Sequence, residues 1–377
     1  MQTQALYKKV IQLIQNRKIE SPSPEEVHKL CQEVLTDESI LLPQSQYQSL
    51  IDQVTHIILG LGPIEPFIQD DEVSEIMVNG LSHIFIERSG KLEATDVSFR
   101  DEAQLLAVIN RIVGRIGRRI DESTPMVDAR LQDGSRVNAI IPPLSLSGPI
   151  LTIRKFPQKS FRITDMLEKK SLSPQMAEFL EQAIQDKENI LISGGTGAGK
   201  TSTLNACAGL IPHSERLITI EDSAEIRIDH PHLISLESRP QNLEGSGEIS
   251  IRQLLKNALR MRPDRIVVGE IRSGEAIDML QAMNTGHRGS LTTLHANAPL
   301  EALFRLETMV LTGGIEMPLP AIRAQIIQGI DLIIQQSRLS DGSRKITEIA
   351  RVEKDLKSSE YKVQTLFKYD ATQDKFI

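Results

Sequence analysis

The sequence predicts an α/β protein in which a parallel-rich sheet occupies the C-terminal part of the chain. From residue 190 onward, short apolar runs alternate with helical segments, and this alternation is typical of parallel strands joined by crossover helices. The candidate strands are 190–193, 217–220, 265–268, 290–294 and 332–335. Between residues 60 and 156 short turns separate the strands instead, which predicts a mixed α+β domain.

The length of 377 residues is sufficient for two domains with an additional N-terminal piece. Residues 1–59 carry apolar side chains at helical spacing, and residues 23–26 resemble a helix start, so we expect a small helical bundle or arm there. A helix that docks on a partner through an apolar face is the alternative. The further divisions that we expect are an α+β domain at 60–156, a polar linker or hinge at 157–172 and a second domain at 173–377.

The composition is that of an ordinary globular protein with an aliphatic core. Hydrophobic residues make up 40% of the chain and charged residues 25%, whereas aromatic residues make up 3% and tryptophan is absent. The net charge of −7 indicates no overall basic surface for nucleic acid, and the scarcity of aromatic side chains argues against stacking on single strands. We therefore expect no nucleic-acid partner.

Cys31 and Cys207 lie far apart in the sequence, so we expect reduced thiols in a cytosolic protein. No paired Cys-x-x-Cys motif occurs, and we therefore expect no zinc. The first residues lack the apolar core of a signal peptide, and no run of about 18 apolar residues occurs, so we expect no membrane-spanning segment.

Residues 194–202 read Gly-Gly-Thr-Gly-Ala-Gly-Lys-Thr-Ser and match the phosphate-binding P-loop. An apolar strand precedes them and a helix follows, which directs a helix N-terminus at an anion. An ordinary glycine-rich turn is the alternative, and this context argues against it. Glycines let backbone N–H groups surround the β-phosphate, Lys200 bridges the β- and γ-phosphates, and the Thr201 hydroxyl holds Mg²⁺. The predicted nucleotide-binding residues are Gly194, Gly195, Thr196, Gly197, Ala198, Gly199, Lys200, Thr201 and Ser202.

Polar or charged residues also follow other predicted strands directly. They are Glu221, Asp222 and Glu225 after 217–220, Glu270 and Arg272 after 265–268, and His295 after 290–294. Ligands of open parallel sheets bind outside the carboxyl ends of the strands, so we expect these side chains to share one edge with the P-loop. Each alone is equally consistent with a helix cap or a solvated loop residue.

Together with the P-loop, these residues favour phosphoryl-transfer chemistry, which requires a metal ion and a carboxylate that orients water. Glu270 fits the carboxylate near Mg²⁺, and the Glu221/Glu225 group fits the general base. His295 has two interpretations, a contact with the γ-phosphate or a cap on its loop.

Several segments resemble the type II/type IV secretion ATPase superfamily. Residues 262–272 resemble its Walker B box, 219–225 its acidic box, and 285–297 its His box. Asp128–Leu131 and Gly134–Pro143 further resemble the CpaF-type ATPases of tight-adherence (Flp-type) pilus systems. The likeness runs from about residue 60 to 350, with the boxes in the family's order.

The resemblance implies a RecA-like P-loop NTPase domain, preceded by a PAS-like α+β domain. It implies a homo-hexameric ring on the cytoplasmic face of the inner membrane, against polytopic platform proteins. There the ring would hydrolyse Mg-ATP at subunit and domain interfaces and power pilus assembly or secretion. The family's tetracysteine motif is missing, which agrees with the expectation of no zinc.

The resemblance also assigns individual residues. Glu225 becomes the catalytic base, Glu270 with Thr201 the magnesium ligands, and Lys200 a catalytic phosphate contact. The remaining active-site candidates are Glu221, Asp222, Arg272, His287 and His295, and the arginines of the α+β domain that match phosphate contacts are Arg130, Arg136 and Arg154. A solvated strand face is the alternative for these arginines, and closure of residues 60–156 over the P-loop is a hypothesis for the power stroke.

Two alternative functions stay open at this point. A nucleic-acid translocase of similar architecture predicts salt-dependent DNA binding that stimulates ATP hydrolysis. A nucleotide-binding scaffold predicts tight ATP binding with no measurable turnover. The acidic net charge argues against the first, and the set of acidic groups at the strand ends argues against the second.

Overall fold

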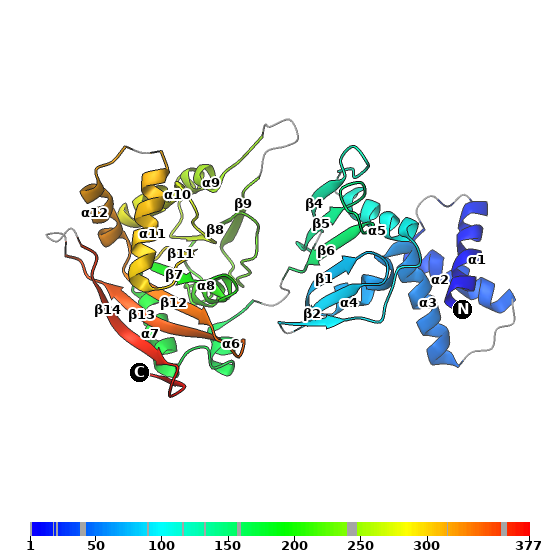
Figure 1. The fold of residues 1–377 in the computed structure, drawn as a ribbon, viewed down its shortest axis with the longest axis horizontal. Helices are drawn as coiled ribbons and strands as arrows, with labels where there is room; N and C mark the ends of the chain where they lie inside the picture. The colour runs from blue at the N-terminus through cyan, green and yellow to red at the C-terminus, as the bar shows by residue number, and fades with distance from the viewer. Residues whose placement is uncertain are drawn as a thin grey trace. The chain divides into compact units, whose positions relative to one another are not determined.

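The computed structural model describes residues 2–17, 19, 22–37, 43–88, 90–114, 117–131, 133–156, 160–239, 247–314, 316–355 and 360–377. The chain divides into two compact units, Met1–Gln158 and Lys159–Ile377 (Figure 1). The expected linker at 157–172 begins at this division, but it also contains helix α6 (Ile163–Glu168), whose Met166 is buried in the second unit.

The first unit begins with three helices, α1 (Gln2–Asn16), α2 (Pro24–Asp37) and α3 (Gln44–Leu59). Their apolar faces meet in an aliphatic cluster that includes Val10, Val27 and Ile51. The predicted helix start is confirmed: the Ser23 backbone N–H donates to Glu26 Oε2 at 2.7 Å, and the Glu26 N–H donates to Ser23 Oγ at 3.2 Å. This reciprocal capping box satisfies two backbone donors at the start of α2.

An antiparallel sheet with the strand order β3-β2-β1-β6-β5-β4 completes the first unit, together with η1 (Gly62–Ile64) and helices α4 (Glu65–Gln69) and α5 (Glu102–Gly114). The strands are β1 (Val73–Asn79), β2 (Ile84–Arg88), β3 (Lys91–Ala94), β4 (Met126–Arg130), β5 (Arg136–Ile140) and β6 (Ile150–Arg154). Ile76 and Val78 point into the core with α5, as the period of two requires. The predicted α+β character is confirmed, and no apolar pattern marks β3, because all of its residues are exposed.

The second unit contains a mixed sheet with the order β15-β14-β13-β12-β7-β11-β10-β8-β9. Its strands are β7 (Ile190–Gly194), β8 (Leu217–Glu221), β9 (Leu233–Glu237), β10 (Arg265–Val268), β11 (Leu291–Leu294), β12 (Leu332–Arg338), β13 (Arg344–Val352), β14 (Val363–Asp370) and β15 (Lys375–Phe376). All neighbours from β12 to β9 are parallel, which confirms the predicted parallel sheet, and β13 to β15 form an antiparallel edge.

Helices cover both faces of this sheet (Figure 1). Ile190 and Ile192 of β7 pack with α6, α7 (Pro174–Gln185) and α8 (Lys200–Ala208), whereas Leu191 points into the opposite layer. The opposite layer contains α9 (Ile251–Ala258), α10 (Glu275–Asn284), α11 (Pro299–Thr312) and α12 (Leu319–Gly329). With both faces covered, polar chemistry is confined to the ends of the strands. Across the described ranges, no helix is both long and apolar enough to cross a membrane.

Candidate active site

The P-loop joins the carboxyl end of β7 to the first turn of α8. Gly197 and Gly199 have φ values of +72° and +97°, a region that side chains with a Cβ rarely adopt. A Cβ on Gly194 would lie 2.4 Å from the carbonyl oxygen of Gln336 on β12. The glycines are therefore required by backbone conformation and by packing, and the loop exposes its N–H groups at a helix N-terminus.

Lys200 lies inside this loop and is 8% exposed. Its Nζ donates to the carbonyl oxygens of Gly194 and Gly195 at 3.1 and 3.2 Å, and it lies 3.4 Å from both ring nitrogens of His295. Burial lowers the pKa of the Lys200 ammonium, and the charge of Glu270 partly opposes that shift. An anion bound in the loop would replace neutral carbonyl partners with charged ones and restore the pKa.

Glu270, directly after β10, connects this lysine to the neighbouring strand ends. Its Oε1 lies 2.8 Å from Nε2 of His295, and its Oε2 accepts a hydrogen bond from Arg272 at 2.7 Å. Arg272 also donates to Asp222 at 3.1 Å. Burial, and then the charge of Lys200, lower the pKa of His295, so its imidazole is neutral at pH 7 and lies against the carboxylate as a neutral ring.

Glu221, the last residue of β8, and Glu225, in the loop that follows, have different surroundings. Glu221 is 3% exposed, and its Oε1 accepts the backbone N–H groups of Glu225 and Ile226 at 2.9 and 3.0 Å. Glu221 therefore orients the loop that carries Glu225. Glu225 is only partly buried. Its charge is one of the smaller contributions that raise the pKa of Arg272, so its carboxylate lies within electrostatic reach of the residues around Glu270.

His287 lies at the other end of the sheet. It precedes β11, whereas His295 follows it, so the two histidines belong to opposite edges of a parallel sheet. The His287 carbonyl accepts a hydrogen bond from Ser290 at 2.8 Å, within the turn that enters β11. Within this chain His287 therefore does not lie at the P-loop, and its assignment to an active site stays a prediction.

The arginine candidates Arg130, Arg136 and Arg154 belong to the first unit. In the β4-β5-β6 ladder, Arg130 is directly opposite Arg136, and Arg136 is directly opposite Arg154. The sequence contained the three residues, but only the strand register shows that they form one row on one face of that sheet. Like charges directly opposite each other in a sheet are unfavourable, which makes this row a candidate anion contact.

Sequence reasoning missed residues from the β12–β13 hairpin that contact the P-loop. Gln336 accepts a hydrogen bond from Thr203 of α8 at 2.7 Å, and Arg344 donates to the Gly197 carbonyl at 3.1 Å. The available signal was the polar Gln335-Gln336 pair at the end of an apolar strand, because a buried polar residue at a strand end indicates a specific partner.

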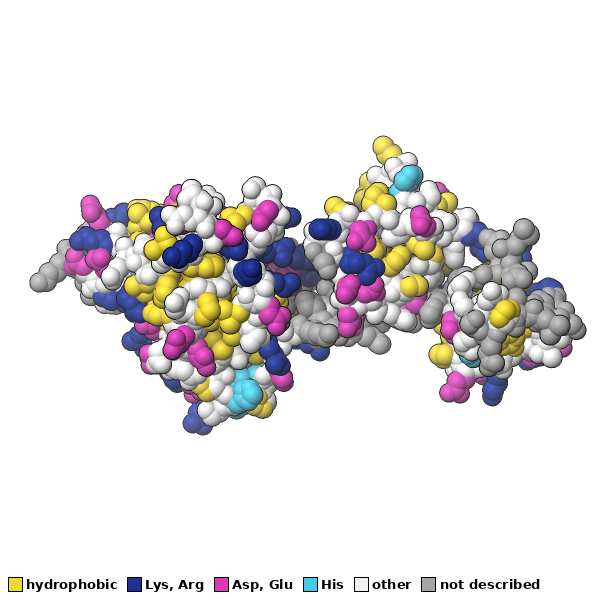
Figure 2. Space-filling model, turned by 90° about the horizontal axis from the view of Figure 1, so that it is seen from below, with side chains coloured by type: hydrophobic (Ala, Val, Ile, Leu, Met, Phe, Trp, Pro, Cys, Tyr) yellow, Lys and Arg dark blue, Asp and Glu magenta, His cyan; other side chains and the backbone are white. Residues whose placement is uncertain are grey.

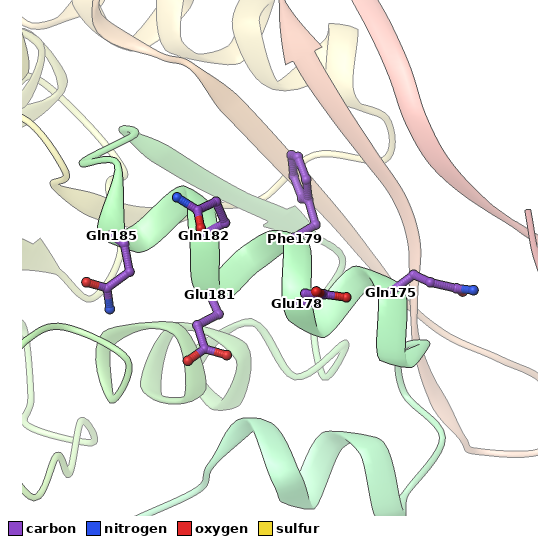
Figure 3. A pocket seen from close by; sticks show the side chains of 6 residues that line it. All are labelled: Gln175, Glu178, Phe179, Glu181, Gln182 and Gln185. Carbon is purple, nitrogen blue, oxygen red and sulfur yellow. The ribbon is translucent and has the colours of Figure 1, made fainter.

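A cavity of about 550 Å³ lies elsewhere, over helix α7, and is lined by Gln175, Glu178, Phe179, Glu181, Gln182 and Gln185. Figure 3 shows that all of these side chains come from one helix. The lining residues include no cationic side chain and no residue of the P-loop, so this surface hollow is not the nucleotide site. On the face seen in Figure 2, basic and acidic side chains are interspersed and form no broad basic surface.

Metal binding at the P-loop edge depends on few protein ligands. No group of three or more His, Cys, Asp or Glu residues that could hold a metal ion occurs within the described part of the chain. The Thr201 hydroxyl belongs to the P-loop, and the Glu270 carboxylate follows the carboxyl end of β10 by two residues. Mg²⁺ is commonly held by one or two such ligands together with substrate phosphates.

Comparisons with known proteins agree with this arrangement of motifs. A putative conjugal transfer protein of Mycobacterium tuberculosis is 34% identical over 299 residues, which are 78% of this chain and 84% of that protein. The type IV secretion system protein VirB11 of Bartonella henselae is 32% identical over 341 residues, covering 80% of this chain and 94% of that protein.

The fold also has a counterpart among solved structures. The Legionella pneumophila ATPase DotB superimposes with a TM-score of 0.54 and 23% identity, over 77% of this chain and 80% of that chain. A family model described as "Type II/IV secretion system protein" matches residues 58–365. The chain therefore belongs to the type II/IV secretion system protein family.

Proposed function

We propose that this ATPase is a motor that hydrolyses Mg-ATP to drive a secretion or pilus machine. The observation that carries the proposal is the Lys200–His295–Glu270–Arg272 cluster, which joins the P-loop to the carboxyl ends of β10 and β11. Phosphoryl transfer depends on positioning and on charge stabilisation, and this cluster provides a cation, a carboxylate and an oriented imidazole beside a phosphate cradle.

The groups at this site have distinct parts in the proposed reaction. The backbone N–H groups of the P-loop and Lys200 bind the β- and γ-phosphates, where Lys200 exchanges its carbonyl partners for phosphate oxygens. Glu225, on the loop oriented by Glu221, orients or deprotonates the attacking water. His295, a neutral ring 2.8 Å from Glu270 Oε1, holds this carboxylate toward the γ-phosphate side of the loop.

The residues present fit a magnesium ion brought by the nucleotide. Thr201 and Glu270 would hold it, because Mg²⁺ prefers oxygen ligands and both side chains belong to the elements that flank the phosphates. The ion would neutralise the charge that develops on the β- and γ-phosphate oxygens.

We further propose that Arg130, Arg136 and Arg154 contact the nucleotide phosphates when the first unit closes on the second. The in-register row of like charges supports this, since an anion would offset the repulsion between neighbouring guanidinium groups. We expect Arg136→Ala to retain ATP binding and to lose turnover. Turnover at the wild-type rate would contradict this role.

The finer assignment follows from the sequence motifs. We propose a CpaF-type ATPase of a tight-adherence pilus system, with a PAS-like first domain, a RecA-like second domain and the domain boundaries given above. We propose a homo-hexameric ring on the cytoplasmic face of the inner membrane, bound to platform proteins. Sedimentation of the full chain with and without a non-hydrolysable ATP analogue tests the ring, and a species no larger than a dimer under both conditions would contradict it.

The proposed activity is tested by phosphate release from purified protein with MgATP. We expect Lys200→Ala and Glu270→Ala each to lower turnover by roughly 100-fold or more, because each removes charge stabilisation at the transferred phosphate. Lys187→Ala, which removes an exposed lysine away from the P-loop, is the matched control and keeps the wild-type rate. Equal turnover in all four proteins would refute the proposed site.

A further inference from the structure

The β12–β13 hairpin places two arginines beside the P-loop, and the mechanism above uses neither. Arg338, the last residue of β12, is directly opposite Arg344, the first residue of β13. Arg344 Nε donates to the Gly197 carbonyl at 3.1 Å. Arg338 Nη1 lies 4.0 Å from the position that a Cβ on Gly197 would occupy, so its guanidinium lies over the same part of the P-loop.

The charges of this pair are unbalanced. Both side chains are exposed, and neither forms an ion pair with a carboxylate of any residue that the structure describes. The acidic residue of the hairpin turn is Asp341, and its Oδ1 accepts hydrogen bonds from the backbone N–H and the hydroxyl of Ser343 at 2.8 and 2.7 Å. Two like charges directly opposite each other destabilise a strand pair, and a bound anion would offset this repulsion.

The sheet order places the arginine pair on a particular side of the P-loop. Strand β7, which carries the loop, lies between β12 and β11. Glu270, Arg272 and His295 belong to the β10 and β11 side, whereas Arg338 and Arg344 belong to the β12 and β13 side. The hairpin arginines therefore flank the P-loop away from the groups assigned to hydrolysis.

We infer that Arg338 binds phosphate oxygens of the nucleotide from the β12 side of the P-loop, and that Arg344 acts as a positioning residue that holds the Gly197 carbonyl. This inference rests on the proposed nucleotide site. It adds a cationic wall to that site, formed by Arg338 and Arg344 of the β12–β13 hairpin in the same unit. Because the wall lies opposite the hydrolytic groups, Arg338 contacts the phosphates shared by ADP and ATP. It contributes to affinity for both nucleotides and not to the chemical step.

The test is calorimetric titration of the full chain with MgADP and with a non-hydrolysable MgATP analogue, together with steady-state ATP hydrolysis. We expect Arg338→Ala to raise the dissociation constant of both ligands about tenfold, as expected for a charge-assisted contact at a partly exposed site. KM rises with it, while kcat stays within about twofold of wild type. Arg338→Lys retains part of the affinity, because it keeps the charge and loses the guanidinium fork.

Lys375→Ala is the matched control, since it removes one exposed positive charge from the same antiparallel edge of the sheet. Its affinities should equal those of the wild type, and the loss in Arg338→Ala should diminish as salt is raised. Wild-type affinity in Arg338→Ala, or a loss confined to the ATP analogue with a fall in kcat, would overturn the inference while the proposed site stands. A wild-type protein that binds neither ligand would overturn the proposed site itself.

Discussion

At each end of the parallel strands in the second unit, a lysine donates to backbone carbonyls: Lys200 is buried, Lys354 is 42% exposed, and the two have different further partners. At the carboxyl edge, Lys200 donates to two loop carbonyls and lies beside a neutral histidine. At the amino edge, Lys354 donates to the carbonyls of Ile327 and Ile330 and pairs directly with Asp331 at 2.9 Å. Burial lowers the pKa of both ammonium groups, and only Lys354 has a carboxylate bound to it that opposes the shift.

Other side chains at the amino edge, like Lys354, bond to backbone groups of distant segments. The guanidinium of Arg265 is fully buried and donates to Glu215 and to the carbonyls of Gly289 and Ile184. Asn189 accepts two backbone N–H groups and donates to the Gly329 carbonyl. These bonds join segments far apart in sequence, so this edge stabilises the fold and has few polar groups available for a ligand.

At the carboxyl edge, Arg272 bridges the carboxylates of Glu270 and Asp222, and both Arg272 and Asp222 are exposed. The Glu270 carboxylate is held by His295 and Arg272, which are side chains and can move. A phosphate can therefore exchange with existing partners without breaking the backbone network. The comparison shows that burial of a charge alone does not identify a site, whereas burial combined with exchangeable partners does.

The largest expected effect separates the two lysines. Lys200→Ala should lower ATP turnover by roughly 100-fold or more and leave the melting temperature almost unchanged. Lys354→Ala should do the reverse, because it leaves Asp331 buried with only part of its ion pairing and uncovers carbonyls. Phosphate release and thermal unfolding of both variants provide the measurement. A loss of turnover in Lys354→Ala at a temperature where it is folded would break the distinction.

The next effect is on stability and concerns Arg265. Arg265→Met should lower the free energy of unfolding by about 3 kcal/mol, since it removes one partner of a buried ion pair and leaves buried carbonyls without donors. Urea unfolding followed by circular dichroism measures the change. Nucleotide affinity of the folded variant should match that of the wild type, and a selective loss of affinity would link the amino edge to the ligand.

A smaller effect should distinguish the two histidines. His295→Gln should reduce turnover about tenfold, because it removes the imidazole that orients Glu270. His287→Gln should change turnover by less than about twofold, since the residue lies before β11 at the amino edge. Steady-state rates at saturating ATP test the pair. Comparable losses in both variants would show that His287 enters an active site in the assembled protein.

The smallest effect concerns the two buried cysteines, Cys31 in α2 and Cys207 in α8. Desolvation raises the pKa of the Cys31 and Cys207 thiols to about 12. Neither thiol should react with a thiol reagent at pH 7.5 until the chain unfolds. The unfolded chain releases these protons first, near the ordinary pKa of 9.0, so stability should decrease as pH rises from about 9 to 12. Rapid labelling of the native protein at neutral pH would contradict the burial.

The sequence by itself determined the features that depend on local pattern. Apolar runs located most of the strands, the alternation with helices predicted the parallel sheet, and the Gly194–Ser202 motif located the phosphate cradle. The position of Glu270 and His295 at one edge also followed, because both directly succeed a strand. The same rule assigns His287 to the opposite edge, since it precedes a strand. The motif resemblance grouped it with the active-site residues without regard to this position.

Only the tertiary structure decided which side chains share a partner. The orienting role of Glu221 depends on how the loop after β8 folds back, and the proximity of the β12–β13 hairpin to Gly197 depends on a contact across 147 residues of sequence. The weakly patterned β9 becomes a strand because β8 offers its open edge. Hydrogen bonds and packing between distant segments create these relations, and no local periodicity encodes them.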